Sequence, residues 1–246
     1  MRYREGMNST DTSQPPVVQR RNAAYLDPVE RRVLGWFAAR LPVAATPDRL
    51  TALGFAGALG ACGAYALASR LPGMLWLASA GIVLNWFGDS LDGTLARWRR
   101  IERPRYGFFL DNSIDLIEQA LLATGLGLSG YIQATLVAAA LASLFMVSML
   151  SLIQARVSGV FDIAYYGIGL TEIRCVLILL NAALYFLPPR SFTILGTPLT
   201  YPDLLASIWI LGNIIVFIAV MLRELRRLDV EDPPRHARDL RRRAER

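Results

Sequence analysis

The chain reads Asp89-Ser-Leu-Asp92-Gly93-Thr-Leu-Ala96-Arg97 and, after nine further residues, Gly107-Phe-Phe-Leu-Asp111-Asn-Ser-Ile-Asp115. On a helix, the first two aspartates are three positions apart and the last two are four apart, so each pair shares one helical face. Two such faces turned toward each other bring four carboxylates together. Crowded carboxylates repel one another unless cations or protons intervene, and hard oxygen ligands favour magnesium, manganese or calcium. The stretch therefore predicts a divalent metal site.

Long apolar runs flank this stretch on both sides. The chain has 246 residues, 54% of them hydrophobic, and several charge-free runs approach the roughly twenty residues that a bilayer-spanning helix needs. The runs predict six transmembrane helices, at 50–69, 71–88, 106–129, 131–155, 168–187 and 204–222. The second helix continues through Asp89 and Asp92, which then lie at or just inside the membrane boundary and must face a wet cavity. We expect an all-α integral membrane bundle of six transmembrane helices.

The segment before the first span predicts a further helix. Asp27-Pro28-Val29-Glu30 is typical of a helix start, with Asp27 as the N-cap, Pro28 in the first turn and Glu30 in the capping-box position. Apolar side chains then fall on one side and arginines elsewhere, namely Val29, Val33, Trp36 and Phe37 against Arg31, Arg32 and Arg40. The expected fold places this amphipathic helix in the membrane interface, although docking on protein explains the pattern equally well.

The two ends of the chain differ in composition from its middle. Residues 1–26 are polar and without periodicity, which predicts a disordered lead that lacks the apolar core of a signal peptide. Residues 229–246 are rich in arginine and predict a basic tail. We therefore expect one membrane domain at 27–228 between the lead and the tail.

Arginines are distributed unevenly among the connections. Eight precede residue 50, five lie in 97–105 and nine follow residue 222, whereas the loops predicted on the opposite side carry only Arg70 and Arg190. The positive-inside rule then places both termini and the aspartates on the cytoplasmic side of the cell membrane. The other arginines of this connection are most simply charges that set the membrane topology and interact with lipid headgroups. They are Arg99, Arg100, Arg103 and Arg105.

Few other side chains offer chemistry. Cys62 and Cys175 fall inside apolar runs, where cysteine usually behaves as a small buried hydrophobe. The only histidine, His236, lies in the basic tail. Histidine-based catalysis and metal ligation are thus nearly excluded, and carboxylates must carry any proton transfer.

The spacing of eight residues resembles the signature of the CDP-alcohol phosphatidyltransferases, integral membrane enzymes that make phospholipid head-group linkages. The matching positions are Asp89, Asp92, Gly93, Ala96, Arg97, Gly107, Asp111 and Asp115. A second similarity lies upstream, where Thr46-Pro47-Asp48-Arg49-Leu50-Thr51 looks like the segment that opens the first span in many members. The second half of the chain matches only in the number and hydrophobicity of its spans.

The resemblance implies a magnesium-dependent transferase. Asp89, Asp92 and Asp111 would ligate one or two magnesium ions, or manganese in their place. Asp115 would share the metal site and, as the catalytic base, accept the proton of the incoming alcohol. The resemblance implies donor contacts for Asp48, Thr51, Gly93, Ala96, Arg97 and Gly107, the last of these where the third span enters close to the second.

The chemistry fits these residues independently of the family. Displacing CMP from a CDP-activated donor needs cations that neutralise the diphosphate and a base for the incoming hydroxyl, and carboxylates can supply both. Gly93 and Ala96 have little side chain, so a nucleotide can approach the helix closely. Arg97 offers a fixed fork of donors for phosphate.

The expected reaction transfers a phosphatidyl group from a CDP-linked donor, first of all CDP-diacylglycerol, to a small alcohol in phospholipid synthesis. A soluble CDP-alcohol with diacylglycerol as acceptor uses the same signature and stays open. The resemblance implies a homodimer in contact with membrane lipids, and we expect no nucleic-acid partner.

The acceptor pocket is expected near residues 158–171, with Arg156, Glu172 and Arg174 at its flanks. This connection departs from the arginine-rich Glu-Arg-Pro-Glu-Arg segment of the inositol-phosphate enzymes, which disfavours inositol phosphate as the acceptor. Two flanking arginines could still hold one phosphate.

Two polar residues lie near the aspartates, and the sequence allows two interpretations of Glu118 but favours one for Asn85. Glu118 follows Asp111 by seven positions and fits either a role in the site or burial beside an arginine. Asn85 lies one turn before Asp89 and is most simply a hydrogen-bonding partner across helices.

Two other protein classes use intramembrane carboxylates. An aspartate-rich prenyltransferase should carry two aspartate clusters and more spans, whereas this chain has one cluster. A cation transporter should show inverted halves with broken helices near the midplane, whereas this cluster lies at one face of the membrane. Metal-dependent release of CMP separates both classes from the expected enzyme.

Overall fold

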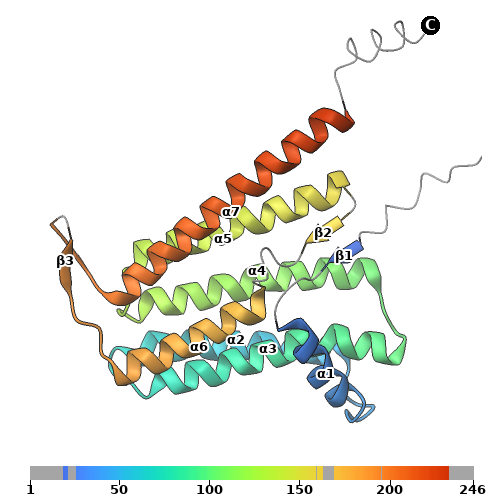
Figure 1. Cartoon of the computed structure of the whole chain (residues 1–246). Coiled ribbons are helices and arrows are strands. Elements are labelled where there is room, and N and C mark those ends of the chain that lie inside the picture. Colours follow the sequence, from blue (N-terminus) through green and yellow to red (C-terminus); the bar gives the residue numbers. More distant parts are fainter. Residues whose placement is uncertain (1–18, 22–25, 159, 163–168, 195, 233–246) are drawn as a thin grey trace, which may run out of the picture.

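The computed structural model describes residues 19–21, 26–158, 160–162, 169–194 and 196–232. Its described helices are α1 Asp27–Ala38, α2 Pro47–Ala68, α3 Met74–Arg99, α4 Pro104–Leu128, α5 Ala134–Ser158, α6 Leu170–Phe186 and α7 Tyr201–Glu231. Short strands β1 Gln19–Arg21 and β2 Val160–Asp162 pair in parallel, and β3 Phe192–Ile194 pairs antiparallel with β4 Thr197–Leu199. Figure 1 shows this second pair at one end of the bundle and α1 at the other. The all-α class is confirmed, whereas the predicted lead and tail lie almost entirely outside the described residues.

Three of the described helices are long and apolar enough to cross a membrane. They are α2, residues 134–157 within α5, and α7. Helix α6 has 17 residues, while α3 and α4 carry the aspartates of the predicted metal site, which lowers their hydropathy. The structure therefore supports a helical membrane protein, and the crossing of the membrane by α3, α4 and α6 stays a prediction.

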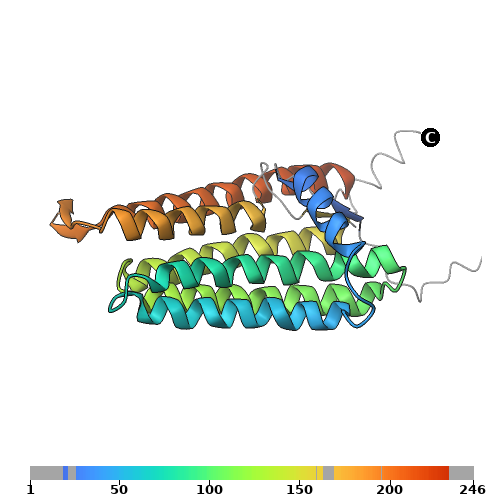
Figure 2. The same cartoon turned by 90° about the horizontal axis from the view of Figure 1, so that it is seen from below.

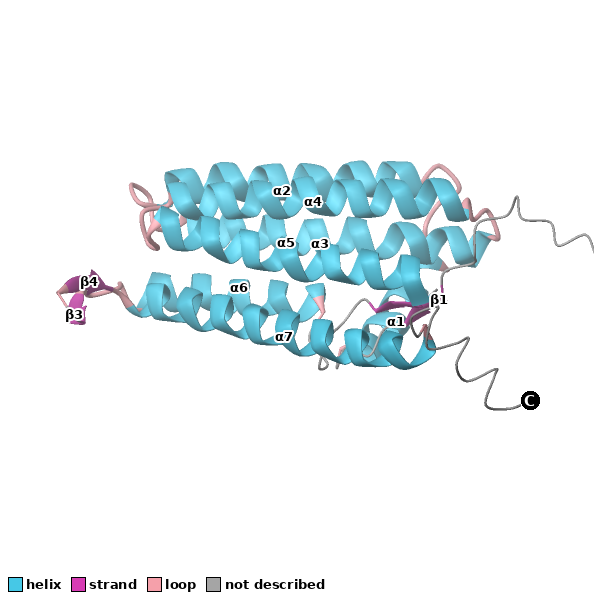
Figure 3. Cartoon of the chain, turned by 90° about the horizontal axis from the view of Figure 1, so that it is seen from above, coloured by secondary structure: helices cyan, strands magenta, loops and turns pink. Residues whose placement is uncertain are grey.

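Six helices form two rows. Helix α3 packs between α2 and α6 in one row, α5 packs between α4 and α7 in the other, and α2 joins the rows through α4. Figures 2 and 3 show α6 and α7 along the side of α3 and α5 that faces away from α2 and α4. Cys62 is half-buried, while Cys175 on α6 is exposed, so the prediction that it is buried was wrong; its side chain faces outward from the bundle.

Glycines set the distance between α2 and α3. A Cβ atom added at Gly57 would lie 2.6 Å from the backbone nitrogen of Asn85, and one added at Gly81 would lie 2.7 Å from the carbonyl oxygen of Gly57. Small residues of this kind let helix backbones approach closely inside a bilayer. The close packing brings the first turns of α2 against the second half of α3, where the predicted metal site begins.

The start of α1 differs from the prediction. Leu26 occupies the cap position in helical conformation without a side-chain cap bond, and Asp27 lies inside the helix, where it pairs with Arg31 at 2.7 Å. The prediction of Asp27 as N-cap and Glu30 as its capping-box partner was wrong, because the Glu30 carboxylate bonds to other helices.

Helix α1 both docks on the bundle and keeps an exposed apolar side. Leu34 and Ala38 are buried in one cluster with Leu91 of α3, while Val29 is 60% and Trp36 is 53% exposed. The two interpretations of its sequence pattern thus apply to different sides of the same helix. An exposed apolar side on a docked helix is compatible with the predicted position in the membrane interface.

Candidate active site

Three of the four predicted carboxylates form one group. Asp89 of α3 and Asp111 and Asp115 of α4 each place one carboxylate oxygen within 4.8 Å of the others, and all three residues are half-buried. The grouping follows from the helical spacing, because Asp111 and Asp115 share the face of α4 that meets the Asp89 side of α3. Hard oxygen ligands at this separation fit a divalent cation such as magnesium.

Asp92 lies beside this group rather than in it. Its carboxylate accepts hydrogen bonds from the Thr51 hydroxyl of α2 and from the backbone N–H of Gly93, and it interacts electrostatically with Asp89 and Asp111. The predicted four-carboxylate cage is therefore a group of three with a fourth neighbour. Thr51, predicted to contact the donor, is brought to the same place by the close packing of α2 on α3.

Arg174 of α6 pairs with Asp89 at 2.8 Å. The arginine is only 8% exposed and also interacts electrostatically with Asp115 and Glu118. The sequence predicted Arg174 only at the flank of an acceptor pocket. Its contact with Asp89, across 85 positions of the chain, has no local signal in the sequence.

Glu118 is a buried carboxylate next to the aspartate group. The residue is 2% exposed. Its carboxylate lies beside the Asn85 side chain, but neither oxygen makes a hydrogen bond of ordinary length and angle among the described residues. It interacts electrostatically with Asp89, Arg174 and Asp111. Both interpretations left open by the sequence therefore apply, because Glu118 is buried near an arginine and also borders the site.

Asn85 forms the bond across helices that the sequence predicts. Its side-chain nitrogen donates to the carbonyl of Gly54 on α2 at 3.3 Å. The side-chain oxygen of Asn85 is buried and has no hydrogen-bond partner in the described part of the chain. This oxygen and the Glu118 carboxylate are thus two acceptors that the surrounding protein does not satisfy.

Three of the predicted donor residues have contacts of their own. Asp48 accepts two hydrogen bonds from Arg103, at 2.8 and 3.0 Å, so Arg103 does more than set the membrane topology. The Arg97 guanidinium lies over Gly93, where an added Cβ atom would be 3.3 Å from its nitrogen. At Gly107 an added Cβ atom would meet nothing within 4 Å, so packing does not require a glycine there, and its predicted role stays a prediction.

Arg99 also has a structural role. Its guanidinium donates to the carbonyls of Leu41 at 3.1 Å and Pro42 at 2.9 Å, and to that of Ala45. These bonds hold the connection between α1 and α2 against the end of α3. The interpretation of Arg99 as a simple topology charge was therefore incomplete.

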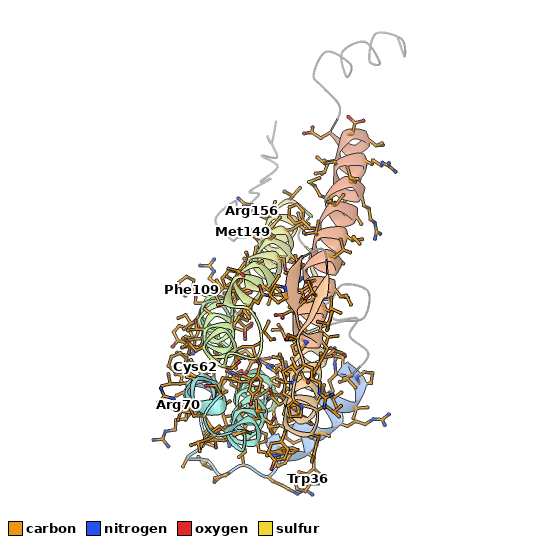
Figure 4. The ribbon with its side chains drawn as sticks, turned by 90° about the vertical axis from the view of Figure 1, so that its left-hand side faces the viewer. Trp36, Cys62, Arg70, Phe109, Met149 and Arg156 are labelled. Carbon is orange, nitrogen blue, oxygen red and sulfur yellow. The ribbon has the colours of Figure 1, made fainter. Side chains whose placement is uncertain are left out.

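A cavity of about 520 Å³ lies between the two helix rows, and Asp115 is the member of the aspartate group that lines it. Asp115, Glu118 and Arg174 line its polar end, and apolar side chains of α4 to α7 line the rest. Glu172 also lines the cavity, whereas Arg156 is not among its lining residues and lies exposed at the end of α5 (Figure 4). The structure thus brings two of the three predicted acceptor residues to the site and leaves Arg156 outside it.

Comparison with known proteins identifies the family. Residues 44–225 match the CDP-alcohol phosphatidyltransferase family. The chain is 31% identical over 152 residues to an archaetidylinositol phosphate synthase of Methanothermobacter thermautotrophicus, covering 62% of this chain and 72% of that protein. It is 34% identical over 101 residues to a phosphatidylinositol phosphate synthase of Cutibacterium acnes, covering 38% of this chain and 46% of that protein. The chain therefore belongs to the CDP-alcohol phosphatidyltransferase family, and it is a membrane transferase of phospholipid synthesis that releases CMP from a CDP-linked donor.

Proposed function

We propose that this enzyme transfers a phosphatidyl group from CDP-diacylglycerol, or a closely similar CDP-linked lipid, to a phosphorylated polyol, of which inositol phosphate is the first candidate. The observation that carries the proposal is the group of Asp89, Asp111 and Asp115, of which Asp115 lines a cavity. The two relatives are named archaetidylinositol phosphate synthase and phosphatidylinositol phosphate synthase, which supports this class of acceptor.

Asp89, Asp111 and Asp115 would hold a magnesium ion, with Asp92 as a further ligand or as a neighbour that keeps the field negative. A bound magnesium ion neutralises the diphosphate of the donor and lowers the pKa of an alcohol. Thr51 supports this arrangement because its hydroxyl fixes the Asp92 carboxylate. Manganese offers the same preference for oxygen ligands.

The donor would bind where Gly93 and Ala96 leave room beside α3. Arg97, whose guanidinium already lies over Gly93, would bind a phosphate of the donor by two parallel hydrogen bonds. Asp48, Thr51 and Gly107 would be further donor contacts. Asp48 would have to share its contact with Arg103.

Asp115 would act as the base. It follows Asp111 by one helical turn and lines the cavity, so it reaches the place where an alcohol would approach the phosphate. There it would accept the hydroxyl proton as the new phosphoester bond forms and the bond between the donor's two phosphates breaks to release CMP. Arg174, held against Asp89 at 2.8 Å, would keep the neighbouring carboxylate in a fixed orientation.

The unsatisfied acceptors support an alcohol with several hydroxyl groups. Glu118 offers two carboxylate oxygens and Asn85 one amide oxygen, all buried and none in a hydrogen bond of ordinary length and angle within the described chain. Hydroxyl hydrogens of a polyol would satisfy them while one further hydroxyl meets Asp115. The missing arginines of residues 158–171 remain the argument against inositol phosphate, and Arg174 is then the residue left to attract its phosphate.

The membrane arrangement is part of the proposal. We place α2 to α7 across the cytoplasmic membrane and α1 in the membrane interface. Both termini and the aspartates would then lie on the cytoplasmic side, where CDP-linked donors are available. A homodimer completes the proposal by resemblance to the family.

An acceptor screen tests the proposed substrate class. Purified full-length enzyme in bilayer nanodiscs would receive CDP-diacylglycerol with inositol 1-phosphate, glycerol 3-phosphate or serine, and separately CDP-choline with diacylglycerol. We expect CMP release with inositol 1-phosphate to exceed that with the other acceptors. Preferential release from CDP-choline and diacylglycerol would instead support the alternative reaction and would overturn the proposed substrates.

A further inference from the structure

One carboxylate joins three helices beside the candidate active site. At one oxygen, Glu30 of α1 accepts hydrogen bonds from the Trp86 indole at 2.9 Å and the Ser90 hydroxyl at 2.7 Å. At its other oxygen it accepts from the Thr171 hydroxyl of α6 at 3.0 Å. Both oxygens are thus engaged, one toward α3 and one toward α6.

A second carboxylate joins α1 and α6 in the opposite direction. Glu172 in the first turn of α6 accepts from the backbone N–H of Leu26 at 2.8 Å and from that of Gly169 at 2.9 Å. Leu26 is the cap residue of α1, and Gly169 is the cap residue of α6. Each of the two helices therefore supplies a carboxylate to the other.

These contacts surround the ion pair between Asp89 and Arg174. Ser90 directly follows Asp89 on α3, and Thr171 lies three residues before Arg174 on α6. Glu30 thus bonds to the near neighbours of both members of the pair. Because charge-assisted hydrogen bonds are the stronger kind, the Glu30 carboxylate fixes how far the start of α6 stands from α3.

The far half of α6 has its own polar anchor. Asn181 accepts from the Tyr65 hydroxyl at 2.8 Å and donates to Ser79 at 3.0 Å. Arg174 lies between this anchor and the contacts at the start of the helix. On its other side α6 borders the cavity, so packing alone restrains its first turns less than the polar contacts do.

We propose that Glu30 is a positioning residue for the reaction. By joining Ser90 to Thr171 it holds Arg174 against Asp89, so that α1 acts as a strap across the cytoplasmic ends of α3 and α6. The residues of α1 precede the segment 44–225 that matches the family, and the comparisons assign them no role. The inference rests on the proposed role of Asp89 in the active site.

Two substitutions remove the strap without removing α1. Glu30→Met removes both carboxylate oxygens and keeps an unbranched side chain of similar length, so it can bond neither to α3 nor to α6. Thr171→Val removes the donor on α6 and keeps the shape of the side chain. Leu34 and Ala38 stay buried against the bundle in both variants, so α1 should remain docked. Glu102→Met, at an exposed carboxylate in the connection after α3, is the matched control.

The first readout is steady-state CMP release. Since a displacement of about 1 Å at an active site can cost roughly a hundred-fold, we expect kcat to fall about ten- to a hundred-fold in Glu30→Met and in Thr171→Val, with KM for CDP-diacylglycerol little changed. The double variant should lose no more than the stronger single one, because both substitutions break the same link. Losses that multiply in the double variant, or a kcat equal to that of Glu102→Met, would overturn the proposal.

The second readout does not depend on activity. Spin labels at the exposed Cys175 of α6 and at Trp98→Cys of α3, in a Cys62→Ser background, report the separation of the two helices. We expect the distance distribution to broaden in Glu30→Met and to stay narrow in Glu102→Met. A narrow distribution in both contradicts the strap even if the proposed substrates are wrong, and a broadened one supports it even if the unsubstituted enzyme releases no CMP.

Discussion

Arg174 of α6 and Asp89 of α3 form a buried ion pair of 2.8 Å at the edge of the aspartate group. The pair ties the second half of the chain to the helix that carries the family signature. It also explains how an arginine can lie nearly buried in a membrane protein, since charges at such depth are retained when they are paired and used.

The first prediction concerns the stability that depends on this pair. Breaking a buried ion pair by removing one partner typically costs about 3–5 kcal/mol because the other charge is left unpaired. We expect Arg174→Gln to lower the free energy of unfolding by an amount of this order, measured by thermal unfolding in nanodiscs. The exposed pair of Arg103 and Asp48 is the control, since Arg103→Gln should cost less than about 1 kcal/mol. Equal losses in the two variants would contradict the prediction.

The second prediction separates Asp115 from Asp89. Losing a general base typically costs about a hundred- to ten-thousand-fold in rate. We therefore expect Asp115→Asn to bind the CDP-linked donor but barely turn over, whereas Asp89→Asn loses both binding and turnover. Isothermal calorimetry with CDP-diacylglycerol, beside CMP release, measures the two effects. An equal loss of donor affinity in both variants would mean that Asp115 is simply another metal ligand.

The third prediction concerns the unsatisfied acceptors near the base. If Glu118 binds hydroxyl groups of the acceptor, Glu118→Ala should raise KM for inositol 1-phosphate about ten-fold or more, the cost of one lost charge-assisted hydrogen bond, while KM for CDP-diacylglycerol stays unchanged. Deoxy analogues of inositol 1-phosphate extend the test. The analogue that lacks the recognised hydroxyl should be used equally well by the variant and the original enzyme. A KM for inositol 1-phosphate that does not move in Glu118→Ala would exclude this role.

The fourth prediction concerns sidedness. We expect both termini and residues 97–105 in the cytoplasm and the regions of Arg70 and Arg190 outside. In a background without Cys62 and Cys175, a membrane-impermeant thiol reagent added to intact cells should modify a cysteine at position 190 and leave one at position 100 unmodified. The reverse labelling pattern would overturn the orientation and the access to cytoplasmic donors.

Local spacing predicted what helical geometry determines. The intervals between Asp89 and Asp92 and between Asp111 and Asp115 fix a shared face on each helix, so the aspartate group could be predicted without knowledge of the fold. The position of Asp92 beside this group could not be predicted from spacing, because its carboxylate accepts a hydrogen bond from Thr51 of another helix.

Partners distant in the chain could not be predicted from spacing. Arg174 reaches Asp89 across 85 positions, and Thr171 reaches Glu30 across 141. The failed capping prediction has the same origin, since Glu30 matches a capping box by its position but bonds to two other helices. The sequence pattern at Glu30 therefore predicted a local capping bond, whereas in the folded chain Glu30 makes contacts to other helices.

The most direct test of the central assignment is CMP release by the purified full-length enzyme at increasing magnesium concentration, with CDP-diacylglycerol and inositol 1-phosphate, beside Asp89→Asn and Asp111→Asn. If the aspartate group is the metal-dependent active site, release by the original enzyme depends on magnesium. Both variants should then be inactive. Asp111→Asn should keep its stability, since a cavity built for cations tolerates the loss of negative charge, whereas Asp89→Asn should be less stable because the buried Arg174 loses its partner. Full CMP release by Asp89→Asn and Asp111→Asn at saturating magnesium would contradict the assignment.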